Sequence, residues 1–184
     1  MKASKKLIIT LVLVITIACV VAGTSLAYLY SATPQLDNRF EPVSVTCEVV
    51  ENFDGNVKSN VAIKNTGDIN AFIRATVIVT WTADDGTVYS SAPIESNDYT
   101  ITYGSGNWVK GSDGFYYYTS PVAPGATTEI LLAQIAPIAG NAPNGYTLTV
   151  HIVATAIQSE PATAVEYAWN ASVNPDGRLI PPLN

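Results

Sequence analysis

The chain has 184 residues, of which 9 are basic, 15 are acidic and only 13% are charged. A chain of this length suits one domain, and its acidic balance makes nucleic acid and anionic membrane surfaces poor partners. Thr, Ala, Val, Asn and Gly are plentiful, which is typical of a β-rich surface protein.

The first thirty residues have the pattern of a secretory signal peptide. Three lysines precede an uncharged apolar run at 7–22, and small residues close the stretch. Signal peptidases require small side chains one and three residues before the cut, and Ser25 and Ala27 supply them. We therefore predict that residues 1–27 are a signal peptide, cleaved between Ala27 and Tyr28, and that the chain is exported by way of a signal peptidase.

Two other interpretations of this segment stay open. As a helix, the apolar run at 7–22 would be roughly 24 Å long, short of a hydrocarbon core of about 30 Å. Adding residues 23–30 would close that gap and make an uncleaved membrane anchor. A lipoprotein would use Cys19 as its lipid acceptor, but the residue three positions earlier is Thr16 and not the usual leucine.

Cleavage would leave 6 basic and 15 acidic residues, a formal charge of −9. Cys47 would then be the only cysteine, so no intramolecular disulfide could form and stability must come from packing. Residues 28–42 are mostly polar with prolines at two positions, which predicts a flexible arm. We expect one domain to follow at 43–184.

The domain begins with two strands joined by a hairpin. Apolar residues alternate along 43–50, which places Cys47 on the buried face as a structural cysteine. An Asp-Gly pair then favours a tight turn, because it tolerates positive φ angles. The return strand at 57–65 points Val61 and Ile63 inward.

The longest regular strand lies at 71–81. One of its faces is wholly apolar and must lie on the core: Ala71, Ile73, Ala75, Val77, Val79 and Trp81. Short aromatic strands separated by Gly-rich turns follow at 99–103, 107–110 and 115–119. A further strand at 127–133 is expected to point Ile130 and Leu132 inward.

The last long strand lies at 146–157, after a loop rich in Pro, Asn and Gly. Its apolar face consists of Tyr146, Leu148, Val150, Ile152, Ala154 and Ala156. A short helix is predicted at about 161–169, because proline is tolerated in a first helical turn. A turn at 174–177 then leads into a loose tail.

Many short strands with Gly, Pro and Asn turns and almost no helix predict an all-β fold. We expect a two-sheet antiparallel β-sandwich with at most one short helix, near the C-terminus. No internal repeat and no second domain are apparent in the sequence.

Few residues suggest catalysis. The only histidine, His151, lies on the polar face of a strand, and the chain has neither a Gly-x-Ser-x-Gly elbow nor a His-Glu-x-x-His helix. Four Asp-Gly turns, at Asp54, Asp85, Asp113 and Asp176, leave calcium open, but the EF-hand spacing is absent and β-turn chemistry explains them better. We predict no enzymatic activity, no cofactor and no metal.

The aromatic run at 115–118, with Trp108 nearby, is the clearest candidate for a binding surface. Alternation sends Phe115 and Tyr117 to one face of the strand and Tyr116 and Tyr118 to the other. Because aromatic rings stack on sugars as well as on each other, Trp108, Tyr116 and Tyr118 are the candidate contact residues for a partner or a glycan.

Several short segments carry a resemblance to a known family. They are Gly23–Tyr28, Lys64–Asp68, Ala71–Arg74 with Trp81, Asp113–Tyr118, Pro124–Gly125, Ala156–Gln158 and Ala168–Trp169. In content and order they resemble the exported TasA/camelysin-type proteins of Gram-positive bacteria, whose signal peptides are removed by the dedicated signal peptidase SipW. Apart from the signal, these segments span most of the chain, from Lys64 to the C-terminal region.

The resemblance implies a protein of the cell surface or biofilm matrix with a jelly-roll or immunoglobulin-like sandwich. In fibre-forming members an N-terminal segment pairs with the next subunit as a donor strand. Here that segment would be about Tyr28 to Phe40, although Pro34 lacks a backbone donor. The leading hypothesis is a secreted, non-enzymatic structural protein that assembles into filaments and meets the membrane only through its signal. An adhesin or carbohydrate binder is the second hypothesis and a secreted protease the third.

Overall fold

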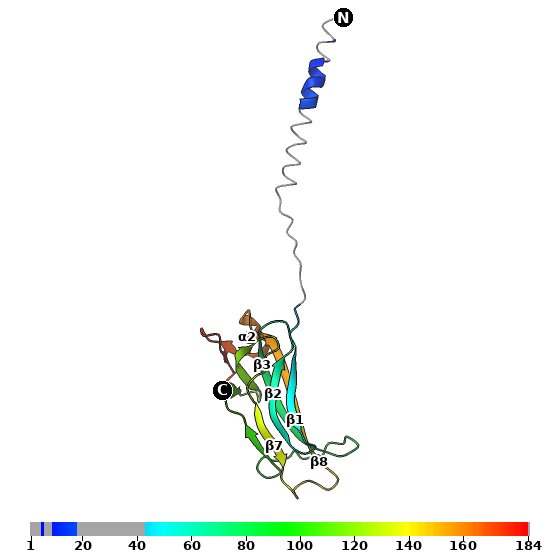
Figure 1. The fold of residues 1–184 in the computed structure, drawn as a ribbon, viewed down its shortest axis with the longest axis vertical. Coiled ribbons are helices and arrows are strands. Elements are labelled where there is room, and N and C mark those ends of the chain that lie inside the picture. The colour runs from blue at the N-terminus through cyan, green and yellow to red at the C-terminus, as the bar shows by residue number, and fades with distance from the viewer. Residues whose placement is uncertain (1–4, 6–8, 18–42, 184) are drawn as a thin grey trace. The chain divides into compact units, whose positions relative to one another are not determined.

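The computed structural model describes residues 5, 9–17 and 43–183 (Figure 1). Residues 9–17 are helical and belong to one unit, Met1–Glu41, whereas Pro42–Asn184 forms a second compact unit. No helix in the described part of the chain is long and apolar enough to span a membrane. The predicted cleavage site between Ala27 and Tyr28 and the predicted arm lie outside the described residues.

The second unit is built almost entirely from strands. In chain order the elements are β1 (Cys47–Phe53), β2 (Lys58–Asn65), β3 (Ala71–Thr82), β4 (Tyr99–Tyr103), β5 (Trp108–Lys110), β6 (Tyr116–Val122), β7 (Leu132–Pro137), β8 (Thr147–Gln158), α2 (Thr163–Trp169), β9 (Ser172–Val173) and β10 (Leu179–Ile180). The predicted hairpin of β1 and β2, the two long strands and the short helix are confirmed, with boundaries shifted by a few residues.

Two four-stranded antiparallel sheets pack face to face, which confirms the predicted β-sandwich with a short C-terminal helix. Sheet A has the order β1-β2-β7-β4 and sheet B the order β5-β6-β3-β8, and β9 and β10 form a small separate ribbon. The order of a jelly roll is kept by six of the eight strands, β2-β7-β4 in sheet A and β8-β3-β6 in sheet B. The other two strands depart from it, because β1 pairs with its hairpin partner β2 and β5 with its hairpin partner β6. The immunoglobulin order, with the fifth strand beside the second, is not followed.

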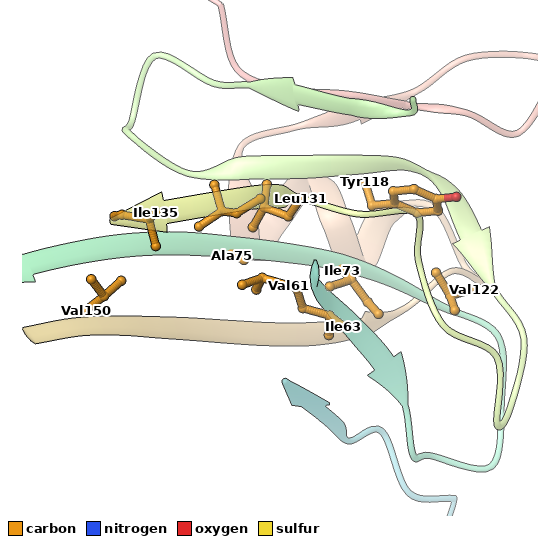
Figure 2. Close-up of a cluster of buried hydrophobic side chains, with 10 residues drawn as sticks. Val61, Ile63, Ile73, Ala75, Tyr118, Val122, Leu131, Ile135 and Val150 are labelled. Carbon is orange, nitrogen blue, oxygen red and sulfur yellow. The ribbon is translucent and has the colours of Figure 1, made fainter. Parts of the chain in front are cut away.

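The inner core lies between the two sheets, where alternation along the strands predicts it (Figure 2). Its buried members are Val61, Ile63, Ile73, Ala75, Tyr118, Val122, Leu131, Leu132, Ile135 and Val150. The predicted apolar face of β8 and the half-buried Cys47 pack against this cluster. The inward direction of Val61 and Ile63 is thus confirmed.

The segment before β7 differs from the prediction. Leu132 is buried as expected, but Ile130 is 38% exposed and Leu131 is buried in its place. The chain runs irregularly beside β2 here: Thr128 donates its N–H to the Ile63 carbonyl and Leu131 donates to the Val61 carbonyl. Regular pairing begins only at Leu132, so the period of two expected for 127–133 does not hold.

A second apolar cluster covers the outer face of sheet B, and no sequence pattern predicted it. α2 and the β9–β10 ribbon pack there around Phe72 and Tyr117, and Val165, Trp169, Ala171 and Leu179 complete the cluster. The predicted loose tail is therefore wrong. Leu179 is buried, and the Pro182 carbonyl accepts the N–H of Ser112 at 2.9 Å.

Candidate functional site

The aromatic run alternates between the two clusters as predicted. Phe115 and Tyr117 face the outer cluster, whereas Tyr116 and Tyr118 face the inner core. Tyr118 is only 9% exposed, and its ring packs edge-on against Trp108 with the centroids 5.2 Å apart. Tyr118 therefore contributes to the core and offers little surface to a ligand.

Trp108 and Tyr116 are half-buried at the edge of the inner core. The indole N–H of Trp108 donates to the Glu129 carbonyl at 2.9 Å, which satisfies its only donor. Tyr116 stacks on Tyr103 with the ring centroids 5.1 Å apart, and the Lys110 ammonium lies 5.5 Å from the Tyr116 ring. The most exposed ring here, at 41%, belongs to Tyr103.

Sequence reasoning missed Tyr103 as a surface residue. It stands at the end of β4, and an open depression of about 620 Å³ next to it is lined by Gly104, Ser105, Glu129 and Ile130 among others. Gly104 has no room for a side chain, since an added Cβ would lie 1.9 Å from the Ile130 carbonyl oxygen. The close approach of these two segments brings Tyr103 and Ile130 together.

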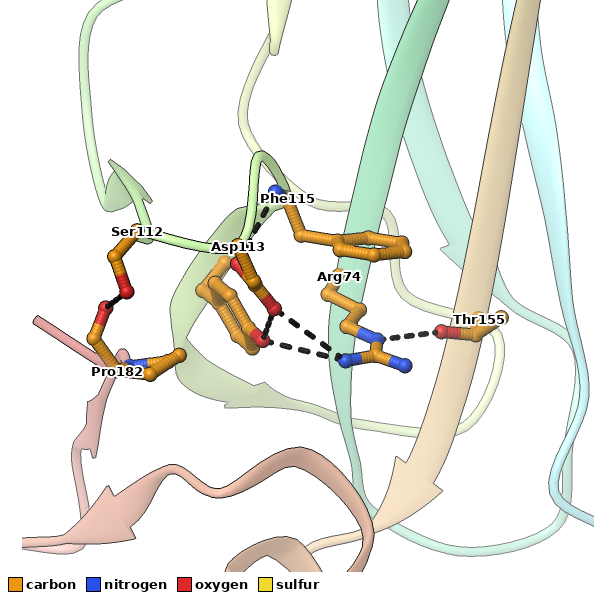
Figure 3. Close-up of polar contacts among 7 residues, drawn as sticks. Arg74, Ser112, Asp113, Phe115, Thr155 and Pro182 are labelled. Atoms are coloured by element: carbon orange, nitrogen blue, oxygen red, sulfur yellow. Dashed lines mark hydrogen bonds and ion pairs between the residues drawn. The ribbon is translucent and has the colours of Figure 1, made fainter.

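Arg74 is the centre of the outer cluster (Figure 3). Its guanidinium carbon lies 4.2 Å from the Phe115 ring centre and 4.7 Å from the Trp169 ring centre, so the charge is held between two aromatic rings. Arg74 Nε donates to Thr155 Oγ1 at 3.3 Å, and Nη1 lies 3.8 Å from the carboxylate of Asp113.

The phenol of Tyr117 links Arg74 to Asp113. Its hydroxyl donates to Asp113 Oδ2 at 2.7 Å and accepts a hydrogen bond from Arg74 Nη1 at 3.3 Å. Burial, together with the hydrogen bond to Asp113, raises the pKa of Tyr117 above its ordinary value. The group as a whole holds α2 and the loop at 111–114 against sheet B, which is a structural role.

Three of the segments that carry the family resemblance meet at this point. Ala71–Arg74, Asp113–Tyr118 and Trp169 come from β3, β6 and α2 and are far apart in sequence. Packing around Arg74 therefore accounts for Asp113, Phe115, Tyr117 and Trp169. Ile73, Tyr116 and Tyr118 of the same segments pack on the inner core instead.

A fourth segment, Lys64–Asp68, fixes the start of the domain. Asn65 is fully buried, and its side-chain amide donates to the carbonyls of Ile69 and Val122 at 2.8 Å. Gly67 lies so close to Ser44 that a Cβ would come within 2.5 Å of the Ser44 carbonyl oxygen. This segment too has a structural explanation.

The polar residues considered for chemistry lie apart from one another. His151 is exposed on β8, as predicted. Burial raises the pKa of the Cys47 thiol, which lowers the fraction of reactive thiolate. Within residues 5, 9–17 and 43–183, no three His, Cys, Asp or Glu side chains gather closely enough to hold a metal ion.

The Asp-Gly turns have local partners. Asp54 Oδ1 accepts the N–H groups of Val57 at 2.8 Å and Asn56 at 3.1 Å, and these bonds lower the pKa of Asp54. Asp85 accepts the N–H of Thr87 at 2.9 Å, with the same effect on its pKa. Both carboxylates complete β-turns, in agreement with the predicted turn chemistry.

Comparison with known proteins identifies no relative: no family model, no curated protein and no solved structure matches the chain. The fold and the individual residues therefore carry the functional argument alone.

Proposed function

We propose that this chain is a secreted, non-enzymatic structural protein of the cell surface or biofilm matrix that assembles into fibres by donor-strand pairing. The observation that carries the proposal is the order of its parts. The predicted export signal precedes the predicted 15-residue arm at 28–42, and the arm precedes a sandwich whose outer strands, within the described residues, pair on one side only. A dedicated signal peptidase would be the first partner, because cleavage after Ala27 gives the arm a free N-terminus.

Open sheet edges are the physical basis for assembly. An edge strand presents a row of free N–H and C=O groups, which is a template for pairing with another chain. Both sheets here end in such strands: β1 and β4 in sheet A, β5 and β8 in sheet B. An arm of 15 residues is long enough to add a strand to a neighbouring copy.

The test begins with export of the full chain from a Gram-positive host that has the dedicated peptidase. Mass spectrometry of the product should find Tyr28 as the first residue, and electron microscopy should find filaments. An Ala27→Phe variant should keep its signal and form none, because the cleavage site needs a small residue. Ala22→Phe, which lies within the apolar run, is the matched control. A processed product that stays monomeric at high concentration contradicts the fibre proposal.

A carbohydrate-binding adhesin is the second candidate, and the stacked rings of Tyr103 and Tyr116 support it. With Lys110 beside them, they form a half-exposed aromatic surface next to an open depression. A glycan array should then show binding that Tyr103→Ala abolishes and Tyr89→Ala, an exposed ring elsewhere, retains. Equal binding by both variants removes this candidate.

A further inference from the structure

The four edge strands are protected to different degrees. β1 carries a bulge between Val50 and Asn52, and its two acidic residues are each paired with a lysine of β2. β4 has five residues, and the segment at Glu95 already pairs with Tyr99 at its start. β5 has only three residues. Bulges, charges and short length are the devices by which proteins prevent strand addition.

β8 has none of these protections. It is twelve residues long and contains no Asp, Glu, Lys, Arg or Pro, and among the described residues it pairs only with β3. Just beyond the end of β8, Ser159 lies opposite Asn70 and donates its N–H to the Asn70 carbonyl, so these two residues form a hydrogen-bonded pair. Hydrogen-bonded and non-hydrogen-bonded pairs alternate along an antiparallel ladder. Counting back from Ser159, the main-chain N–H and C=O groups of Leu148, Val150 and Ile152 therefore point away from β3. These groups have no main-chain partner in the described chain.

A groove runs along the first half of this edge. It has a volume of about 400 Å³ and is lined by residues 147–151 of β8 on one side and by Phe53, Asn56 and Lys58 on the other. Phe53 is 61% exposed, so it offers apolar surface at the rim. The only charged lining residue, Lys58, is already paired with Glu51 at 2.5 Å. An uncharged, extended segment is the occupant that fits.

The groove and the entry of the chain lie at opposite ends of the domain. The chain enters at Ser44, whose carbonyl accepts the N–H of Asp68 beyond the Cys47 end of β1. Phe53, at the groove, is the other end of β1, about 20 Å away for a strand of seven residues. An arm that leaves one copy at its entry end is therefore placed to meet the groove end of the next copy.

We propose that this groove accepts residues Tyr28–Thr33 of a second copy, which add to β8 as a further strand. The inference rests on the proposed fibre function and identifies its acceptor. The stretch 28–36 is uncharged, like β8, and its first six residues contain no proline. Residues 34–42 then act as the linker, which spans up to about 30 Å when extended. Head-to-tail contacts give filaments wherever the rotation between successive copies does not close a ring.

Amide exchange in the assembled, processed protein tests the acceptor. Fibres labelled in D2O and dissolved for NMR should show exchange slowed about tenfold or more at Leu148 and Val150, relative to unassembled protein. The outward-pointing amide of Ile101 on β4 is the internal control and should not change. Protection at β4 without protection at β8 overturns the inference and leaves the fibre proposal standing.

Substitutions in the arm test the occupant without touching the folded domain. Tyr30→Pro should abolish filaments, because proline breaks the hydrogen bonds of an added strand. Gln35→Pro, in the linker, should leave filaments intact. Filaments formed equally by both variants overturn the assignment of Tyr28–Thr33. Absence of filaments from correctly processed wild-type protein overturns the fibre function and the acceptor together.

Discussion

The two apolar clusters of this domain are built on opposite faces of the same sheet. The inner core joins sheets A and B, and nearly all its residues belong to regular strands. The outer cluster joins sheet B to α2 and to the β9–β10 ribbon near the end of the chain. The inner cluster defines the sandwich, whereas the outer one attaches a cover to it.

The difference lies in how each cluster is assembled. The buried members of the inner core named above are aliphatic or aromatic, and Tyr118 alone among them has a polar tip. The outer cluster contains a charge, Arg74, which is held by two rings, a carboxylate and two hydroxyls. We therefore expect the inner core to determine global stability and the outer cluster to determine whether α2 stays attached.

Truncation in the inner core should have the largest effect. Leu132→Ala should lower the free energy of unfolding by about 4 kcal/mol, because it removes a fully buried side chain and leaves a cavity. The neighbouring Ile130→Ala should cost only about 0.5 kcal/mol, since Ile130 is substantially exposed. Urea unfolding followed by tryptophan fluorescence measures both. Equal losses would mean that Ile130 faces the core after all.

Truncation in the outer cluster should cost less and act locally. Trp169→Ala should lower stability by about 3 kcal/mol, because the indole is 7% exposed and packs on Arg74 and Tyr117. The rate of amide exchange in this variant should increase more in α2 than in β3. Tyr167→Ala on the same helix is the control, since this ring is 91% exposed. Uniform acceleration across both sheets would contradict a separable cover.

The charge in the outer cluster can be tested separately from its packing. Arg74→Met keeps the apolar stem but removes the guanidinium, and should cost about 2 kcal/mol through the lost stacking and hydrogen bonds. Arg74→Lys keeps the charge without the planar group and should recover part of this loss. Thermal unfolding of the two variants gives the comparison. A Met variant as stable as wild type would show that the cluster needs only apolar contact.

The inner core could be predicted from sequence because one strand face is a local pattern. The alternation from Ala71 to Trp81 and from Tyr146 to Ala156 places these residues without knowledge of their partners. The outer cluster could not be predicted in this way. Phe72 shares its strand face with Arg74 and Thr76, so the local pattern does not mark this face as buried. The segment that covers Phe72 and Tyr117 arrives some ninety residues after Phe72. Long-range contact of this kind leaves no period in the sequence.

The candidate sites also differ in whether a local sequence pattern predicts them or only the fold brings their residues together. The alternation of Phe115 to Tyr118 could be predicted, but the choice of Tyr118 as a contact residue did not allow for a second sheet over it. Tyr103 was missed because only the fold brings it next to Tyr116. The groove beside β8 forms only where the two sheets meet, because its lining residues come from both of them. No local sequence motif among these residues indicates the groove. Ala27 and Tyr28 stay predictions of the signal pattern alone.

The smallest expected effect is a dependence on alkaline pH that the outer cluster contributes. Burial and the hydrogen bond to Asp113 hold the pKa of Tyr117 above its unfolded value of about 10. Both states stay protonated at neutral pH, so stability is level there. Above pH 10 the unfolded chain releases this proton first, so the free energy of unfolding falls as the pH rises.

A Tyr117→Phe variant separates this contribution from those of other tyrosines. It should be slightly less stable at pH 7, because it loses the hydrogen bond to Asp113, and its stability should fall less steeply between pH 10 and 11. Burial also raises the pKa values of Tyr99, Tyr103 and Tyr116 around the inner core, so some slope should remain. Urea titrations at each pH measure the slopes. If wild type and variant lose stability in parallel, the alkaline sensitivity belongs to the inner core and not to the cover around Arg74.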